Sequence, residues 1–430
     1  MPTALLAREL PGWIDPAELY LGGPATARSS FWLDAGPGAT AGWSWLGTAE
    51  PAPEPPGDLA LTLAPADVSL PGPFHGGWVG WLGYDAAAAD AGAPARRDDF
   101  APERSGLRVQ RFVAVDHGAR RVWAIAPEQD IDAFARDVAT WRRQATAVPA
   151  RAVEASGRHT PARYAALVDD CREAIRRGDA YQLCLTTRFQ VEAAIDPVEA
   201  YLRLRAETPT HHGGLLRVDG FALASASPER FLEIRDGIIR TRPIKGTRPR
   251  AATPSDDAAL ARELRGSVKE QAENVMIVDL MRNDLQRVCE PGSVAAERLL
   301  EVESYRAVHQ LVSTVAGRLR PGTRLRDVLD AAFPAGSMTG APKLSAMTLL
   351  HDLEAAPRGV FAGAFGWIGD DGSADLAMVI RSIVFHRTGA YVGAGGGITW
   401  RSDPAAEVAE VGVKARGPLA ALGARLPPGW

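Results

Sequence analysis

The chain has 430 residues, of which 46% are hydrophobic and 23% charged, and its formal net charge at pH 7 is −4. These values are typical of a globular protein with a sizeable core, and they exclude a disordered chain and a basic surface for nucleic acid. No apolar run is long enough to span a bilayer, and the first residues lack the pattern of a signal peptide. We therefore expect a cytoplasmic protein that binds neither nucleic acid nor membrane.

Lysine is rare: only four of the 48 lysine and arginine residues are lysines, at Lys245, Lys269, Lys343 and Lys414. A lysine retained where arginine serves as the general cation is a candidate for chemistry that arginine cannot perform, such as losing a proton and acting as a nucleophile. The three cysteines have no CxxC pair or metal-site spacing, so we expect buried, reduced thiols at Cys171, Cys184 and Cys289.

Residues 1–150 contain short apolar runs broken by Pro- and Gly-rich stretches. A hairpin is predicted over residues 111–126 with its turn at 116–118, and the alanine-rich residues 86–95 are predicted to form a loop. This region shows no cluster of catalytic residue types, so we expect it to contribute scaffold.

A well-marked helix follows. Thr160 can cap it, Pro161 suits its first turn and Gly178 suits its end, and residues 180–191 then read as a strand. Two Asp-Gly turns predict successive hairpins over residues 215–227 and 231–243. A two-residue turn at Asp236–Gly237 would place Glu229 across from Ile244, beside Lys245, so that an acid and an amine meet at the open end of one hairpin.

Further along, one helix is predicted over residues 256–284, a hairpin around Asp371–Gly372, and a final helix capped by Asp403. Each of the two helices carries a pair of carboxylates on one face. Such pairs are more often solvated surface, but their neighbourhood is rich in apolar and glycine residues, which favours a Mg²⁺ site built from both faces. The pairs are Glu270 with Glu273, and Glu407 with Glu410.

Two glycine-containing segments stay ambiguous. Residues 392–399 (VGAGGGIT) form either an anion-binding loop or a tight turn, and residues 334–343 (PAGSMTGAPK) form either an anion-binding loop or a loop that opens a helix. The spacing in the second segment is not that of a Walker motif, so a nucleoside triphosphate is excluded.

Seven ordered motifs together resemble the chorismate-utilising enzymes: GDAYQLCLTTRF (178–189), SASPERF (225–231), RPIKGTRPR (242–250), KEQAENVMIVDLMRNDL (269–285), GSMTGAPK (336–343), GAGGGIT (393–399) and EVAEVGVK (407–414). The resemblance implies an α+β fold in which two large antiparallel sheets pack as a sandwich with helices outside. Residues 1–150 would contribute to the sandwich, and residues 156–424 would form the chorismate-binding catalytic domain.

Two positions bear on the reaction. The hydrolytic members resemble one another in having a water-activating lysine where Gln182 stands, so this chain looks like an aminating member. Anthranilate synthases usually have alanine at the position of Lys245, whereas the lysine is similar to that of aminodeoxychorismate synthases. Anthranilate synthase component I is the enzyme alternative. A non-catalytic binding subunit is the alternative from another class, and the retained Glu229, Lys245 and four carboxylates argue against it.

The resemblance implies that Lys245 attacks C2 of chorismate while Glu229, the general acid and base, protonates the departing C4 hydroxyl, and that ammonia then yields 4-amino-4-deoxychorismate. Mg²⁺ on Glu273 and Glu410, with Glu270 and Glu407 behind them, would hold the ring carboxylate. The remaining substrate contacts implied are Gln182, Gly246, Thr247, Thr339, Arg381, Gly395 and Lys414.

Two positions depart from the family pattern, since Gln310 replaces a histidine and Phe361 a tyrosine; we assign no catalytic role to the neighbouring His309. No cysteine has the surroundings of a glutaminase nucleophile, so ammonia is expected from a separate glutamine amidotransferase partner or from free ammonia. The pathway that uses the product stays open between folate, through p-aminobenzoate, and a specialised metabolite.

Overall fold

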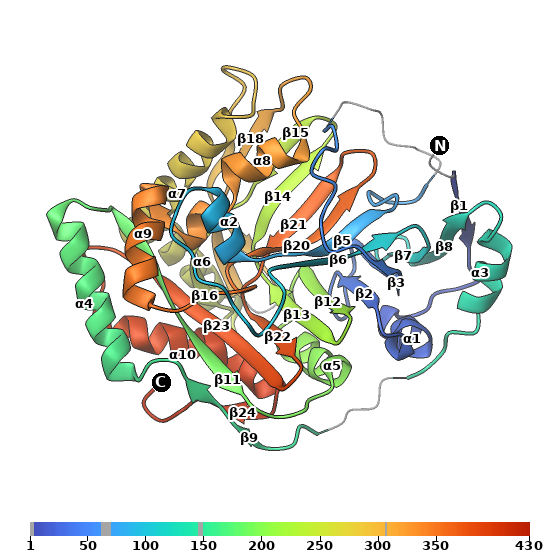
Figure 1. The fold of residues 1–430 in the computed structure, drawn as a ribbon, viewed down its shortest axis with the longest axis horizontal. Coiled ribbons are helices and arrows are strands. Elements are labelled where there is room, and N and C mark those ends of the chain that lie inside the picture. Colours follow the sequence, from blue (N-terminus) through green and yellow to red (C-terminus); the bar gives the residue numbers. More distant parts are fainter. Residues whose placement is uncertain (1–3, 62–69, 145–148, 306–307) are drawn as a thin grey trace.

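The computed structural model describes residues 4–61, 70–144, 149–305 and 308–430, and its core is two large antiparallel β-sheets with helices around them (Figure 1). This arrangement confirms the predicted α+β fold. Among the described residues, no helix is both long enough and apolar enough to cross a membrane.

The larger sheet has twelve strands and combines the first third of the chain with its last two-thirds. In spatial order its strands are β1 (Leu5–Glu9), β8 (Arg121–Pro127), β7 (Phe112–Asp116), β3 (Trp43–Thr48), β2 (Ser30–Asp34), β12 (His212–Val218), β13 (Phe221–Ser227), β22 (Ser382–His386), β23 (Gly389–Ile398), β11 (Gln182–Val191) and β10 (Ser156–Gly157), with β19 (Gly340–Ala341) also paired to β11.

Within the described residues the second sheet has ten strands, which come from the same two parts of the chain. In spatial order its strands are β16 (Ile244–Pro249), β18 (Val308–Arg318), β15 (Ile238–Thr241), β14 (Arg230–Arg235), β21 (Ala374–Met378), β20 (Ala364–Gly369), β5 (Gly77–Leu82), β6 (Arg104–Val109) and β4 (Glu50–Pro51), with β17 (Ala295–Ser304) also paired to β18. A short parallel pair joins β9 (Val153–Glu154) to β24 (Ala424–Arg425).

The helices lie outside the sheets. Figure 1 shows α10 and α4 alongside β23 and β11, and α7 beside β18. The helices of the described chain are α1 (Pro16–Gly22), α2 (Tyr84–Asp90), α3 (Ile131–Val138), α4 (Pro161–Arg177), α5 (Pro197–Glu207), α6 (Pro254–Gly266), α7 (Val268–Gln286), α8 (Leu325–Ala332), α9 (Lys343–Glu354) and α10 (Pro404–Ala421), with 3₁₀ turns η1 (Pro24–Thr26) and η2 (Gly336–Met338).

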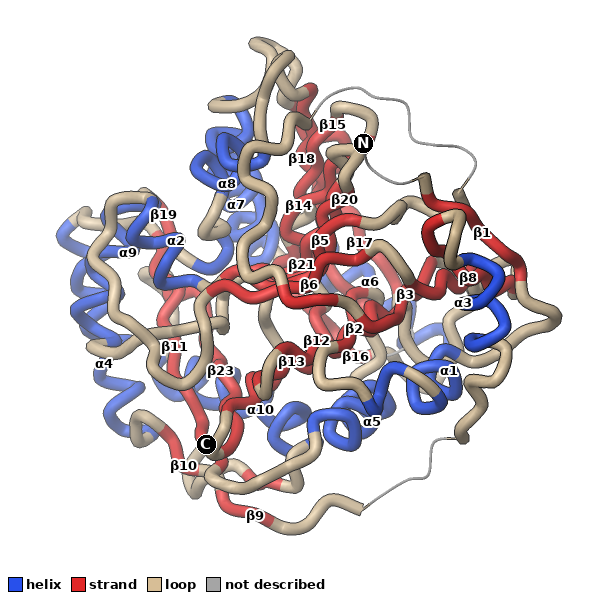
Figure 2. The backbone as a smooth tube through the Cα atoms, turned by 45° about the vertical axis from the view of Figure 1, so that its right-hand side comes forward, coloured by secondary structure: helices blue, strands red, loops and turns tan. Residues whose placement is uncertain are grey.

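The central strands of each sheet are buried on both faces, because side chains that alternate along a strand enter different cores. In β2, Phe31 and Leu33 join a core between the two sheets, whereas Trp32 joins a core between the larger sheet and its helices. In β5, Val79 enters the core between the sheets, whereas Trp78 enters a third core that also contains residues of α7 and α8. The molecule is therefore a sandwich of helices, sheet, sheet and helices, as the tube in Figure 2 shows.

Several local predictions are confirmed. The Thr160 side chain caps α4 by accepting a hydrogen bond from Arg163 N, and Gly178 ends this helix with φ +86°. The hairpins at residues 112–127, 212–227, 230–241 and 364–378 form, and the Asp403 side chain caps α10. The three cysteines are buried and unpaired.

Two predicted elements are wrong. The helix expected over residues 256–284 is two helices, because Ser267 leaves the helical conformation (ψ 106°) and its side chain caps α7 through Glu270 N. Residues 86–95 were expected to form a loop, but residues 86–90 belong to helix α2. Alanine is the strongest helix former, and burial of Ala87 and Ala88 stabilises this helix.

Candidate active site

Two chain segments pass side by side from one sheet to the other, and each carries a predicted site residue. The link from β13 to β14 contains Glu229, and the link from β21 to β22 contains Arg381. Their backbones are hydrogen-bonded, since Ala226 N donates to Arg381 O (3.2 Å) and Met378 N donates to Glu229 O (3.0 Å). The acid and the guanidinium therefore lie where the two sheets meet.

Glu229 is a buried acid, with 7% of its surface exposed. Burial raises the pKa of its carboxyl to about 7, although the Ser337 hydroxyl and the charges of Lys245 and Lys414 act in the opposite direction. At neutral pH a large fraction of this carboxyl holds a proton, which is the property that a general acid needs.

Lys245 lies in an irregular part of β16. The pairing of this strand with β18 shifts in register between Ile244 and Thr247, and Gly246, at φ +82°, occupies the gap. A Cβ at Gly246 would lie 3.0 Å from the Glu270 side chain, so glycine is required for both conformation and space. Bulges of this kind redirect side chains next to active sites.

The predicted pairing of Glu229 with Ile244 is not formed. The hairpin keeps the expected register from Arg235↔Ile238 to Glu233↔Arg240, but Ile244 pairs with Val312 of β18 instead. The predicted proximity of Glu229 to Lys245 nevertheless agrees with the structure, in which the lysine charge lowers the pKa of this carboxyl.

The glycine run at residues 393–397 is neither an anion-binding loop nor a tight turn; it is the end of strand β23, paired with β11. A Cβ at Gly396 would lie 2.9 Å from Glu407 Oε2 and 3.6 Å from Glu410 Oε1. At Gly397 it would lie 2.7 Å from Gln182 Nε2 and 3.2 Å from Lys245 Nζ. The run is therefore a strand without side chains, which leaves room for functional groups from neighbouring elements.

The four predicted metal ligands lie on α7 and α10. The two helices are electrostatically coupled, because the charge of Glu410 raises the pKa of Glu273, although burial raises it most. Burial also raises the pKa of Glu407. For Glu410, burial is opposed by the ion pair with Lys414 (2.6 Å) and by Lys245 and Lys269, so its pKa is lowered overall.

These carboxylates fit Mg²⁺ by chemistry, since the set is all oxygen and its mutual repulsion would be relieved by a cation. Nearby cations also contact them: Glu270 lies 3.5 Å from Arg248, and Glu273 lies 3.9 Å from Lys269. In the described part of the chain, no three His, Cys, Asp or Glu side chains are close enough together to hold a metal ion.

Several predicted substrate-binding groups have unused hydrogen-bonding capacity. Gln182 is fully buried, and neither its Nε2 nor its Oε1 has a partner among the described residues. The Arg381 guanidinium makes no ion pair with any residue described, and burial lowers its pKa. Buried polar groups are nearly always hydrogen-bonded, so the unsatisfied amide of Gln182, which borders Gly397 together with Lys245 Nζ, is suited to a polar ligand.

The other predicted contacts are differently placed. The Thr339 hydroxyl donates to Ala335 O and Gly336 O, and Lys414 Nζ donates to Gly395 O (2.7 Å). Thr247 is exposed on β16 and lies opposite Gln310.

At the two positions where the chain departs from the family pattern, His309 (next to Gln310) and Phe361 have structural contacts. His309 contacts Asp257 (2.9 Å) and Ser304 (2.8 Å), consistent with its having no assigned role. Phe361 is buried, and a Cβ at Gly393 would lie 2.1 Å from its ring, so the two are in close contact. Residues 334–343 form η2 and β19 before α9, and are a loop that opens a helix.

A buried ion pair that the sequence did not indicate supports strand β11 and the turn η2. Glu354 Oε1 accepts hydrogen bonds from Thr186 N (2.8 Å) and Oγ1 (2.9 Å) and also pairs with Arg358. Arg358 in turn donates to Cys184 O (2.7 Å) and Met338 O (2.6 Å). The only available signal was two opposite charges four residues apart, which is common on protein surfaces.

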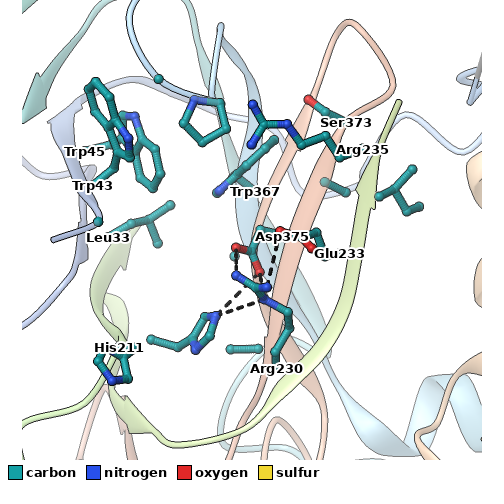
Figure 3. A pocket seen from close by; sticks show the side chains of 18 of the residues that line it. Leu33, Trp43, Trp45, His211, Arg230, Glu233, Arg235, Trp367, Ser373 and Asp375 are labelled. Carbon is teal, nitrogen blue, oxygen red and sulfur yellow. Dashed lines mark hydrogen bonds and ion pairs between the residues drawn. The ribbon is translucent and has the colours of Figure 1, made fainter. Parts of the chain in front are cut away.

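A separate cavity of about 350 Å³ lies between the two sheets, and none of the predicted site residues lines it. Trp43 and Trp45 stand on one side, and the paired side chains of Arg230 and Asp375 stand on the other (Figure 3). Arg230 Nε and Nη2 donate to the two Asp375 oxygens at 3.0 and 2.9 Å, so the central charges of this cavity are paired.

Residues 48–420 match the model of the chorismate binding enzyme family. The chain belongs to the chorismate binding enzymes. This family member is 40% identical to anthranilate synthase component 1 of Streptomyces coelicolor over 92% of its own length and 84% of that protein. The resemblance read from the seven motifs is confirmed at the level of the family.

Other relatives carry the name aminodeoxychorismate synthase. The protein from Streptomyces pristinaespiralis is 43% identical over 85% of this family member, which spans about half (53%) of that relative's length. Aminodeoxychorismate synthase component 1 from Salmonella typhimurium is 38% identical to this chain. The match covers 79% of this chain and 75% of the Salmonella protein. The crystal structure of anthranilate synthase component I from Streptococcus pneumoniae matches with a TM-score of 0.74 at 27% identity, over 97% of this chain and 92% of that one.

Proposed function

We propose that this chain converts chorismate to 4-amino-4-deoxychorismate through a covalent adduct on Lys245. The observation that carries the proposal is the position of Lys245, whose charge acts on the buried acid Glu229 and on the carboxylates Glu273 and Glu410. The names of several relatives support the same reaction.

In the proposed reaction, Lys245 in its neutral form attacks C2 of the ring. The ring double bonds shift, and the C4 hydroxyl leaves as water with a proton from Glu229. Ammonia then attacks C4 and expels the Lys245 amine, while the enolpyruvyl group stays in place. Arg381, whose guanidinium has no ion-pair partner among the described residues, is suited to the side-chain carboxylate of chorismate.

Mg²⁺ bound by Glu273 and Glu410, with Glu270 and Glu407 behind them or through water, would supply positive charge for the ring carboxylate. Ammonia is proposed to come from a separate glutamine amidotransferase, since relatives are named component 1. The remaining proposed substrate contacts are Gln182, Gly246, Thr247, Thr339, Gly395 and Lys414.

Anthranilate synthesis is the second candidate, because one relative aligned along most of both chains has that name. The two reactions separate by product. The chain should be incubated with chorismate, Mg²⁺ and ammonium, and the product identified by mass. Retention of the three-carbon side chain supports the proposal, whereas anthranilate, which has lost it as pyruvate, rejects it.

The adduct has its own test. Under turnover, intact-mass analysis should detect wild-type protein carrying the ring. Lys245→Ala should lose both the adduct and the 4-amino product, since no other lysine among the described residues has the same position. Lys245→Ala that forms the 4-amino product at the wild-type rate contradicts the covalent scheme.

A further inference from the structure

Arg381 has a backbone conformation that residues with a side chain rarely adopt. Its φ is +52°, in the left-handed region where a Cβ atom crowds the following carbonyl oxygen. It lies in the link that crosses from β21 in one sheet to β22 in the other. A glycine would adopt this conformation without strain, so an arginine at this position indicates that its side chain is needed there.

The peptide groups on both sides of Arg381 are held by hydrogen bonds. On the N-terminal side, the Ser382 hydroxyl donates to Ile380 O (2.8 Å). On the C-terminal side, Arg381 O accepts from Ala226 N of β13 (3.2 Å). The φ and ψ angles of a residue are the rotations that relate these two peptide planes. Fixing both planes therefore fixes the direction in which the Arg381 side chain leaves the backbone.

Ser225 of β13 extends this hydrogen bonding across the sheet. Ser225 and Ser382 are paired in register, and their hydroxyl oxygens lie 2.8 Å apart. Ser382 has a single hydroxyl hydrogen, which it donates to Ile380 O, so Ser225 is the donor to Ser382 Oγ. Two hydrogen bonds in series thus run from β13 to the carbonyl group that precedes Arg381.

The two hydroxyls lie on a face of the sheet that otherwise carries apolar side chains. Ser225 is fully buried, and 2% of the surface of Ser382 is exposed. Leu223 and Val384, two positions away on the same strands and therefore on the same face, enter the apolar core between the sheets. A buried hydroxyl contributes little apolar contact and costs free energy unless it is hydrogen-bonded. The hydrogen bonds, rather than packing, therefore explain why serines stand here.

The Arg381 side chain extends towards the candidate active site. Burial lowers the pKa of its guanidinium, and the charge of Glu410 on α10 acts in the opposite direction, so the guanidinium lies near the carboxylates of that helix. It makes no ion pair with any residue described. A fixed cation without a partner of its own is suited to an anionic group of a ligand.

We propose that Ser225 and Ser382 are positioning residues: their hydrogen bonds hold Arg381 in its left-handed conformation and keep its guanidinium aimed at the side-chain carboxylate of chorismate. The inference rests on the proposed function, which assigns this carboxylate to Arg381. A misdirected guanidinium weakens binding of the substrate and of the transition state alike. Loss of the serine hydroxyls is therefore expected to raise KM for chorismate more than it lowers kcat.

The test measures KM and kcat for chorismate consumption at saturating Mg²⁺ and ammonium. Ser382→Ala removes both hydrogen bonds of the series and should raise KM about tenfold, with kcat changed less than about twofold. Ser225→Ala leaves the bond from Ser382 to Ile380 O and should raise KM about threefold. Ser382→Thr keeps a hydroxyl and should bring KM back to within about twofold of the wild-type value.

Ser30→Ala is the matched control. It removes a buried hydroxyl from β2 of the same sheet, with its 2.8 Å hydrogen bond to Tyr20 Oη, and should keep the wild-type KM. An equal rise of KM in this control marks a general effect of packing and overturns the positioning role. A wild-type KM in Ser382→Ala, with or without a lower melting temperature, also overturns it. If Ser382→Ala does not fold, a wild-type KM in Ser225→Ala decides against the role in the same way.

Arg381→Ala separates this inference from the proposed function. It should raise KM more than Ser382→Ala does, and adding Ser382→Ala to it should raise KM no further, because the guanidinium that the serines direct is gone. A further rise of about tenfold in the double variant overturns the role of the serines alone. A wild-type KM in Arg381→Ala shows that the proposed carboxylate contact is wrong, and the role of the serines is then rejected with it.

Discussion

Replacing Gly397 by alanine is the most direct perturbation of the candidate site, because it adds one carbon atom between two of its functional groups. That atom would lie 2.7 Å from Gln182 Nε2 and 3.2 Å from Lys245 Nζ, where ordinary contact begins at 3.4 Å. The Gln182 amide must therefore withdraw by about 0.7 Å, and the Lys245 amine by about 0.2 Å. Gln182 is fully buried, so its retreat displaces other packed atoms.

The expected effect follows from the sensitivity of catalysis to position. A misplacement of about 1 Å in a reacting group costs on the order of 100-fold in rate, equivalent to about 2.7 kcal/mol in the barrier. We expect Gly397→Ala to lower kcat by roughly this factor, as measured by steady-state chorismate consumption with saturating Mg²⁺ and ammonium. Thermal unfolding measured in parallel separates this loss from a loss of folded protein.

Gly57→Ala is the matched control, since its added carbon would lie 3.9 Å from the nearest atom, Arg326 Cβ, and outside the site. It should keep wild-type kinetics. Wild-type kcat and KM in Gly397→Ala would refute the reasoning, because Gln182 and Lys245 would then not need the space that the glycine strand leaves.

Three further predictions concern protonation, metal and stability. The Glu229 carboxyl has a pKa of about 7, and its protonated form is the acid, so kcat/KM should fall as pH rises through about 7; a profile flat to pH 9 contradicts this. Glu273→Ala and Glu410→Ala should lose the response to added Mg²⁺ after chelation, and an unaltered titration would reject both as ligands. Arg358→Met leaves the charge of Glu354 buried without a partner cation, so denaturant unfolding should show a loss of about 3–5 kcal/mol in the free energy of unfolding. Arg176→Met, at the exposed pair with Glu173, should change this free energy little. Equal effects of the two substitutions would contradict the assigned role of burial.

Local chemistry explains which elements were predictable. Capping by Thr160 and the left-handed Gly178 depend on neighbouring residues alone, as do the Asp-Gly turns, where Asp236 and Gly237 adopt φ +51° and +70°. Prediction failed for segments whose secondary structure depends on contacts with distant residues. Pairing with β11 turns the glycine run into a strand, and packing of Ala87 and Ala88 favours a helix over a loop.

The sequence by itself determined the family and the two carboxylate-bearing helical faces, because motif order and helical spacing are local properties of the chain. Only the tertiary structure decided that Glu229 and Arg381 stand at adjacent crossings between sheets, and that Gly397 makes room for Gln182 and Lys245 from other elements. These relations join residues more than 100 positions apart in the chain, and no periodicity in a single sequence records which distant surfaces pack together.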